Sequence, residues 1–236
     1  YPQNLETKYF LKRIKTKKIN HIGNLKFAEN PEENFAIKNK KLKSELNKNK
    51  IWVASSTHKN EEIFCANAHK ELKKKNKNLI TIIIPRHVHR ANEIALEMKK
   101  INLNVAYHSS KIQTLKNIDI YIVDTFGETR KFHNIASTVF LGGSIINRGG
   151  QNPLEAARFG ANILHGPNIN NFQDVYKLLK FLKVSKKINT PRDLASNINF
   201  RKNKLAGKKI KNIGKKILIR TIKELDILIN NEFKKT

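Results

Sequence analysis

Short apolar segments rich in β-branched residues alternate along this chain with segments whose apolar residues recur every three or four positions. The first kind predicts strands and the second predicts helices. We expect strands at residues 51–56, 79–85, 104–109, 118–124, 137–143 and 161–166, and helices at 60–75, 91–101, 152–160 and 170–182. Strands joined by helices run parallel, with helices on both faces of the sheet. The pattern therefore predicts an α/β fold with a doubly wound, Rossmann-like parallel sheet.

The two ends of the chain differ from this middle part. Residues 1–19 have a helical pattern and open without a methionine, so we expect them to lead from a domain further upstream. Residues 186–236 are rich in lysine and end in an apolar helical stripe, which predicts C-terminal helices. The charged stretch at 30–50 is typical of a solvated helix or linker. We therefore expect a leading helix over 1–19, a sheet domain over 20–185 and terminal helices over 186–236.

The chain is strongly basic, with 47 Lys and Arg against 19 Asp and Glu and a formal net charge of +28. Such a charge attracts nucleic acids or an anionic membrane surface. Lysine is spread along the whole chain, and asparagine and isoleucine are also abundant, as AT-rich codons produce. We interpret the charge as codon bias with a general attraction for anions, in preference to a dedicated nucleic-acid face. The single cysteine, Cys65, excludes an internal disulfide and suits a buried position in a helix.

Polar residues gather where the predicted strands end. GNLK at 23–26 follows the apolar stretch INHI, which we take as a short strand, PRH at 85–87 follows LITIII, and FGE at 126–128 follows IDIYIV. GGS at 142–144 and GGQNPLE at 149–155 both follow STVFL. The carboxyl ends of parallel strands meet at one edge of a sheet, where ligands bind. Glycines there let the backbone approach a ligand and expose N–H groups that bind phosphate.

Each of these motifs also has a purely structural interpretation. GNLK and PRH are ordinary turn sequences, and NPLE is an ordinary helix start with Asn152 at the N-cap and Glu155 at the third helical position. The functional alternative is that Glu155 accepts hydrogen bonds from a sugar diol. The chain has no Gly-x-Gly-x-x-Gly motif, Walker loop or Asp-x-Asp motif, and its histidines lack metal-binding spacing. We therefore expect no metal and no cofactor, with phosphate neutralised by Lys26, Arg86 and backbone N–H groups.

Taken together and in this order, GNLKF, ASSTH, PRH, FGE, GGS and GGQNPLEAARFGANILHGP resemble the C-terminal domain of the 3-deoxy-D-manno-octulosonic acid (Kdo) transferases, over about residues 1–182. The resemblance implies the C-terminal half of a glycosyltransferase with two Rossmann-like domains, the GT-B type. It implies that this half binds the donor CMP-Kdo and that an N-terminal domain binds a lipid A precursor, lipid IVA, and anchors to the anionic inner membrane. The implied activity is metal-independent, inverting Kdo transfer in lipopolysaccharide biosynthesis, at the cytoplasmic face of the bacterial inner membrane.

The resemblance also implies roles for individual residues. Lys26 is expected to stabilise the negative charge that grows on the departing CMP. The expected contacts to CMP are Pro85, Arg86, Phe126, Gly127, Glu128, Asn152, Pro153, Leu154 and Glu155. The further contacts to the donor are Gly143, Ser144 and Gln151. The family often reads His-Gly-Gly-His where this chain has Arg148-Gly149-Gly150-Gln151, and more commonly has Met where Phe126 stands.

The family's general base is a glutamate of the N-terminal domain, so no residue of this chain is expected to serve as the base. We expect the chain alone to bind CMP-type ligands and to catalyse little. Two alternatives from other classes remain. One is a stand-alone nucleotide-binding module without transfer activity, and the other is a basic RNA-binding protein, as the net charge of +28 first suggests.

Overall fold

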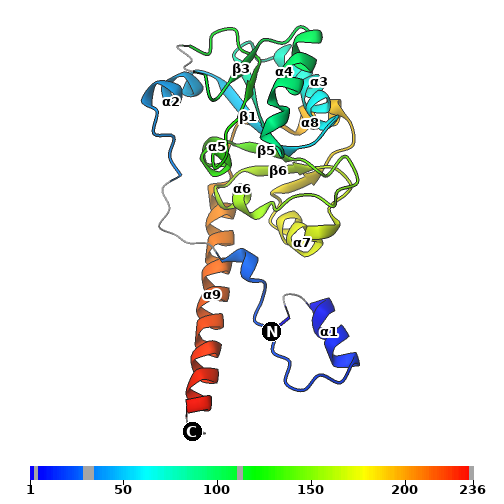
Figure 1. Ribbon diagram of the computed structural model, residues 1–236, viewed down its shortest axis with the longest axis vertical. Helices are drawn as coiled ribbons and strands as arrows, with labels where there is room; N and C mark the ends of the chain where they lie inside the picture. The colour runs from blue at the N-terminus through cyan, green and yellow to red at the C-terminus, as the bar shows by residue number, and fades with distance from the viewer. Residues whose placement is uncertain (3–4, 29–34, 111–113, 234–236) are drawn as a thin grey trace. The chain divides into compact units, whose positions relative to one another are not determined.

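The computed structural model of the chain describes residues 1–2, 5–28, 35–110 and 114–233 (Figure 1). The chain divides into two compact units. The larger unit spans residues 34–206 and contains the whole β-sheet, whereas the smaller unit combines residues 1–33 with 207–236. The sequence placed the sheet domain at 20–185, so the larger unit begins and ends further along the chain than that expectation.

The sheet of the larger unit is built from seven parallel strands in the order β3-β4-β2-β1-β5-β6-β7. The strands are β1 Lys50–Thr57, β2 Leu79–Pro85, β3 Val105–Tyr107, β4 Ile120–Ile122, β5 Thr138–Leu141, β6 Asn162–His165 and β7 Ser185–Lys187. From β1 the chain builds the sheet toward β3, and it then crosses back to place β5 on the other side of β1. This order confirms the predicted doubly wound, Rossmann-like α/β fold.

Helices follow the strands and cover the sheet. They are α2 Lys40–Asn47, α3 Glu61–Lys73, α4 Ala91–Lys100, α5 Thr129–Ile135, α6 Leu154–Arg158, α7 Gln173–Phe181 and α8 Pro191–Asn197. α3 packs against α4 and α8, and α5 packs against α6. The core under α3 joins Trp52 of β1, Cys65 of α3 and Met98 of α4, all fully buried. Cys65 is therefore the small buried hydrophobe that the sequence predicted.

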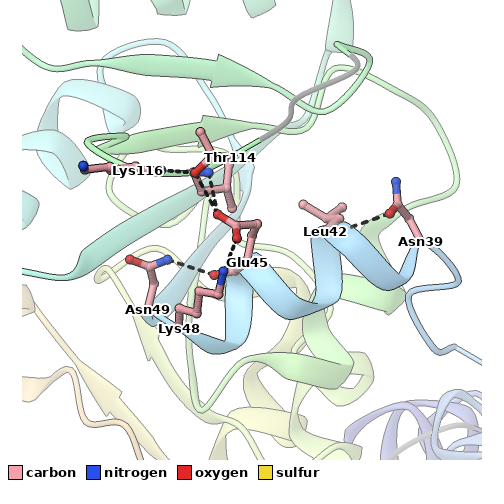
Figure 2. A network of polar contacts seen from close by, with 8 residues as sticks. Asn39, Leu42, Glu45, Lys48, Asn49, Thr114 and Lys116 are labelled. Atoms are coloured by element: carbon pink, nitrogen blue, oxygen red, sulfur yellow. Dashed lines mark hydrogen bonds and ion pairs between the residues drawn. The ribbon is translucent and has the colours of Figure 1, made fainter.

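Glu45 ties α2 to the segment that leads into β4 (Figure 2). Its Oε2 accepts hydrogen bonds from the Thr114 hydroxyl at 3.0 Å and the Leu115 backbone N–H at 2.9 Å, and its Oε1 accepts one from Lys48 at 2.5 Å. These donors, Lys48 first, lower the pKa of Glu45 to about 2. Asn39 caps the helix by accepting the Leu42 N–H at 3.0 Å. The stretch predicted as a solvated helix or linker thus contains a helix that is anchored to the sheet unit; its residues 30–34 lie outside the described residues.

The smaller unit contains α1 Leu5–Arg13, a 3₁₀ helix at Leu25–Phe27 and most of α9 Lys204–Phe233. The segment around Gly23 lies close to α9, because a Cβ on Gly23 would stand 2.9 Å from Ile217. The predicted terminal helices are confirmed by α8 and α9, but the sequence missed the edge strand β7, whose Ser-Lys-Lys sequence is polar and mostly exposed. Among the described residues, no helix has an apolar stretch long enough to cross a membrane.

Candidate functional site

The order of the strands reverses between β1 and β5, which are neighbours in the sheet. In parallel α/β sheets, ligands bind beyond the carboxyl ends of the strands at such a reversal. The loops after β2, β4 and β5 all leave the sheet at this edge. PRH follows β2, FGE follows β4, and GGS and NPLE both follow β5. The structure thus brings four predicted motifs to one rim.

The fifth motif, GNLK, belongs to the smaller unit. The prediction that a strand precedes it is wrong, because residues 19–22 form no strand and Lys26 lies in the 3₁₀ helix of the smaller unit. INHI has the composition of a strand, but a strand also needs a neighbour with which to pair. Lys26 is exposed, and its backbone N–H donates to Asn24 Oδ1 at 2.9 Å. It borders a cavity of about 420 Å³ whose lining also includes Tyr1 and Glu224.

The carboxylate of Glu61, at the start of α3, joins the loops after β1 and β5. Its Oε2 accepts the backbone N–H groups of Gly143 at 2.7 Å and His58 at 3.0 Å. Its Oε1 accepts those of Ser144 at 3.1 Å and Ile145 at 3.0 Å. Glu61 is fully buried, and these four donors compensate the cost of burying its charge. Glu61 was not among the predicted site residues, although an acidic residue in the first turn of a helix that follows a strand is a usable signal.

The bonds to Glu61 change the expected role of the GGS loop. The sequence predicted that N–H groups of this loop bind phosphate. In the structure, the N–H groups of Gly143 and Ser144 donate to the carboxylate of Glu61. Ser144 is also fully buried, and its Oγ donates to the Leu141 carbonyl while accepting the Gly166 N–H at 2.8 Å. Ser144 therefore holds the loops after β5 and β6 together, and its contact to the donor stays a prediction.

Glycines in the loops after β5 and β6 are required because backbone approaches backbone closely there. A Cβ on Gly142 would stand 2.3 Å from the Ser56 carbonyl oxygen, and one on Gly166 would stand 2.2 Å from that of Ser144. Gly149 and Gly150 have φ values of +77° and +76°, a conformation that favours glycine. Glycines after β5 and β6 thus let the loops after β1, β5 and β6 pack together at the edge of the sheet.

The PRH motif projects an exposed cation from the end of β2. Pro85 is buried and pairs with Thr57 of β1, and the Arg86 backbone N–H donates to the Thr57 carbonyl at 2.9 Å. The Arg86 and His87 side chains are exposed beyond this anchor. The motif therefore forms the turn that its structural interpretation predicted. It also presents a guanidinium that a ligand can reach.

The FGE motif combines an exposed aromatic ring with a paired carboxylate. Phe126 is 83% exposed, and Gly127 has a φ of +80°. Glu128 precedes α5 and accepts a hydrogen bond from Lys131 at 2.8 Å, and its other oxygen lies 3.5 Å from Nε2 of His108. Burial lowers the pKa of His108, and Glu128 opposes that shift. Glu128 also borders a cavity of about 430 Å³, lined further by Ile37, Lys38, Asn39, Lys41, Leu42, His108, Ser110, Tyr121 and Lys131.

The NPLE motif begins α6 one residue later than predicted. Asn152 Oδ1 accepts the Leu154 N–H at 3.1 Å, so Asn152 does support the helix start, while Pro153 occupies the N-cap position. Pro153 and Leu154 are buried and anchor the turn. The carboxylate of Glu155 lies 3.7 Å from the Arg130 guanidinium of α5, with about a third of its side chain exposed. Glu155 therefore links α6 to the helix that follows FGE and still reaches solvent.

The described residues contain no group of three or more His, Cys, Asp or Glu side chains that could hold a metal ion. Gln151 is half-buried, with its Nε2 3.4 Å from the position of a Cβ on Gly143. The same Cβ position on Gly143 lies beside Arg148 and His58, which were not among the predicted site residues. The clearest sequence signal for Arg148 was its departure from the family's usual histidine.

Several curated transferases are similar to this chain. The 3-deoxy-D-manno-octulosonic acid transferase of Haemophilus influenzae is 29% identical over 177 residues, which covers 75% of this chain and 42% of that protein. The Rickettsia felis transferase of the same name is 33% identical over 180 residues, covering 76% of this chain and 39% of that protein. A probable mitochondrial transferase of the same kind from Arabidopsis thaliana is 33% identical over 170 residues, covering 69% and 37%. The chain spans about two fifths of the length of these relatives.

No protein-family model matches the chain. Among solved structures, it is similar to the C-terminal CMP-Kdo binding domain of WaaA from Acinetobacter baumannii, with a TM-score of 0.60 and 21% identity. The match covers 72% of this chain and 89% of that domain. These comparisons confirm the resemblance found in the sequence: the chain is homologous to the 3-deoxy-D-manno-octulosonic acid transferases over about three quarters of its length, and it has the fold of a C-terminal domain of that family.

Proposed function

We propose that the larger unit binds CMP-Kdo and that the chain is the donor-binding part of a glycosyltransferase that moves Kdo to a lipid A precursor. The observation that carries this proposal is the meeting of PRH, FGE and NPLE at the carboxyl edge of one parallel sheet. The Arg130–Glu155 ion pair joins the helices after FGE and NPLE, so these two motifs are held side by side. Homology to Kdo transferases supports the choice of ligand.

The exposed groups on this rim match the parts of a cytidine nucleotide. Arg86 supplies a guanidinium for phosphate. Phe126 exposes a large apolar ring that a nucleobase or ribose would cover favourably. Glu155 supplies carboxylate oxygens for the ribose diol, away from the phosphate that would repel it. With Glu61 occupying the amides of the GGS loop, these side chains carry the recognition of the ligand.

The remaining functions belong to the rest of the proposed enzyme. Lys26 stabilises the charge that develops on CMP as the bond to Kdo breaks, in a transfer that needs no metal. An N-terminal domain supplies the general base and the acceptor site for lipid IVA, and it brings the enzyme to the cytoplasmic face of the bacterial inner membrane. The length of the relatives, of which this chain covers 37–42%, is consistent with such a second domain.

Thermal unfolding of the 236-residue chain with CMP, UMP or AMP tests the proposal. A ligand at about 100 times its Kd stabilises the folded state by about 2.7 kcal/mol, which corresponds to a Tm increase of about 5–10 °C for a protein of this size. We expect CMP to give the largest increase and EDTA to leave it unchanged. The absence of a shift at millimolar CMP would contradict the proposal, and salt-dependent RNA binding without a response to CMP would favour the RNA-binding alternative.

A further inference from the structure

Basic side chains from three loops meet where the order of the strands reverses. His58 follows β1, Arg86 and His87 follow β2, and Arg148 lies in the loop after β5. The rings of His58 and His87 stand edge to face with their centroids 5.9 Å apart. The side chains of Arg86, His87 and Arg148 are exposed. We call these four residues the switch-point cluster.

The backbone around Arg148 is fixed by hydrogen bonds on both sides. The Gly150 N–H donates to the Gly143 carbonyl at 2.9 Å, and the Arg148 carbonyl accepts from Asn171 Nδ2 at 3.2 Å. A Cβ on Gly143 would lie 3.4 Å from Cβ of Arg148 and 3.5 Å from Cδ2 of His58. Arg148 and His58 therefore approach the same glycine. The Arg148 side chain extends from a backbone that hydrogen bonds hold in place.

The charges of the cluster are not balanced within it. Burial lowers the pKa of His58, Glu61 opposes this, and electrostatic interactions with His87, Arg148 and Arg86 lower the pKa further. The carboxylate of Glu61 could balance this positive charge, but its oxygens already accept hydrogen bonds from four backbone N–H groups. In the part of the chain that the structure describes, Nε2 of His58 is shielded from solvent without a hydrogen-bond partner. A buried polar atom without a partner beside two exposed guanidinium groups points to an anionic ligand.

The proposed donor carries two anionic groups on one carbon. Kdo is an ulosonic acid, so its anomeric carbon bears the carboxylate as well as the phosphate oxygen of CMP. Neighbouring strands are about 4.8 Å apart, so β2 and β5, which flank β1, end about 10 Å from each other. Arg86 follows β2 and Arg148 lies in the loop after β5, so the two guanidinium groups come from the two strands that flank β1 and can serve two adjacent anions. A guanidinium is suited to this task because it can donate two parallel hydrogen bonds to one carboxylate.

We propose that Arg148, with His58 and His87 beside it, binds the carboxylate of the donor's sugar acid, while Arg86 serves the nucleotide phosphate. This inference rests on the proposed function and adds a determinant of specificity for a sugar acid. The family often has a histidine where Arg148 stands, and a histidine is charged only under acidic conditions. The arginine provides a permanent charge at that place.

Calorimetry on the full chain with two ligands, CMP and CMP-Kdo, tests the inference. Arg148→Gln is expected to weaken CMP-Kdo binding by about 10-fold to 100-fold, the range for a lost hydrogen-bonded charge, and to leave the Kd of CMP within about 2-fold. Arg148→Lys should recover part of the lost affinity. Lys59→Gln is the matched control, because Lys59 is exposed on the same rim and loses the same charge. Thermal unfolding of each variant checks that the fold is intact.

The outcomes separate this inference from the proposed function. Selective loss of CMP-Kdo affinity in Arg148→Gln, but not in Lys59→Gln, supports the carboxylate site. An equal loss for CMP and CMP-Kdo would overturn it, because Arg148 would then serve the phosphate, and so would unchanged binding of both ligands. If the unmodified chain binds neither ligand, the proposed function itself fails, and the carboxylate site fails with it.

Discussion

The carboxylate of Glu61 accepts the backbone N–H of Gly143 at 2.7 Å, so a residue at the start of α3 holds the loop that follows β5. Consecutive backbone N–H groups after a strand are a common phosphate site in nucleotide-binding folds. Here Gly143, Ser144 and Ile145 give their N–H groups to an internal anion instead. We therefore expect this rim to bind phosphate through side chains, with its loop conformation set before any ligand arrives.

Replacing Glu61 should destabilise the fold. In Glu61→Gln, the amide nitrogen of the new side chain would face backbone N–H donors, which leaves buried groups without acceptors. We expect the free energy of unfolding to fall by about 2–3 kcal/mol, as for other buried hydrogen bonds to charged groups. Urea unfolding measures this loss. Glu93→Gln is the control, because the Glu93 side chain is 44% exposed and its pair with Arg90 should contribute less than about 1 kcal/mol. Equal effects of the two substitutions would contradict this role of Glu61.

Two glycines of the rim should differ sharply in their tolerance of alanine. A Cβ on Gly142 would meet the Ser56 carbonyl oxygen at 2.3 Å, so Gly142→Ala must displace backbone and should cost about 3 kcal/mol or more. Gly127 has open space around the same position, and only its positive φ opposes alanine, at about 1–2 kcal/mol. Denaturant unfolding of both variants tests this order. A larger loss for Gly127→Ala would show that conformation, not space, governs these glycines.

The sequence predicted the sheet well because its central strands are continuous apolar runs. LITIII at 79–84 is buried at every position and lies within β2, and the alternation with helices was enough to give a parallel fold. β7 was missed because an edge strand of Ser-Lys-Lys carries no apolar signal. INHI at 19–22 carried that signal, but it has no strand to pair with in the described structure. A local sequence pattern indicates which residues are buried, whereas the pairing of a strand depends on residues far away in the chain.

The site was predicted less completely for a related reason. The order of motifs was enough to place PRH, FGE and NPLE on one rim. The partner of the GGS amides could not be found this way, because Glu61 lies 82 residues from Gly143. Similarly, Arg148 and His58 meet at Gly143 only through packing of the loops after β1 and β5. A motif indicates which backbone N–H groups could bind a ligand. Whether those N–H groups are already bonded to the protein itself depends on residues that only the folded chain brings close.

His133 should make stability depend on pH. Burial, and then the charge of Arg130, lowers its pKa to about 4, while Nε2 is hydrogen-bonded to Ser55 at 2.9 Å. In the unfolded chain the pKa returns to about 6.5, so between these values the unfolded state binds more protons and stability falls as the pH falls. At about 1.36 kcal/mol per pH unit, lowering the pH from 6.5 to 5 costs roughly 2 kcal/mol.

The substitution His133→Gln isolates this contribution, because glutamine does not titrate and can still hydrogen-bond to Ser55. Urea unfolding at pH 7.5 and pH 5 should show a smaller loss of stability for the variant than for the unmodified chain, by roughly 2 kcal/mol. His58, His108 and His165 also have lowered pKa values and change stability in the same direction. The contribution of His133 is therefore the difference in pH dependence between His133→Gln and the unmodified chain. Identical pH dependence in both proteins would contradict a neutral, buried His133.

Glu155 should contribute to CMP binding beyond its pair with Arg130. Glu155→Gln removes the charge and keeps the size, so loss of a hydrogen bond to the ribose diol should weaken CMP binding by about 1.5–3 kcal/mol. If Glu155 only pairs with Arg130, stability should fall by about 1 kcal/mol or less and the affinity should not change. Asp174→Asn is the control, since Asp174 is an exposed acidic residue in the first turn of α7. Calorimetry with CMP decides, and unchanged affinity would return Glu155 to a structural role.

Lys26 should matter for the rate of transfer more than for the binding of CMP. We expect a complete enzyme, made by joining this chain to a matching N-terminal domain, to transfer Kdo from CMP-Kdo to a lipid A precursor. In that enzyme Lys26→Ala should lower kcat by roughly 100-fold or more, as when one preorganised charge stabiliser is lost. CMP affinity should change less, because Lys26 acts on charge that develops during bond breaking. Lys26→Arg should restore little activity, since a planar guanidinium does not replace a compact ammonium group.

The control for Lys26 is Lys17→Ala, which removes an exposed lysine from the same unit of the chain. Steady-state assays on the Lys26→Ala, Lys26→Arg and Lys17→Ala forms separate a specific role from a general effect of charge. A general electrostatic effect on an anionic donor would lower kcat/KM similarly in all three and would weaken with salt. A catalytic charge lowers kcat in the two Lys26 variants and spares Lys17→Ala. Equal kcat in Lys26→Ala and the unmodified enzyme would remove Lys26 from the mechanism and leave the proposed nucleotide site standing, because that site is built from residues of the larger unit.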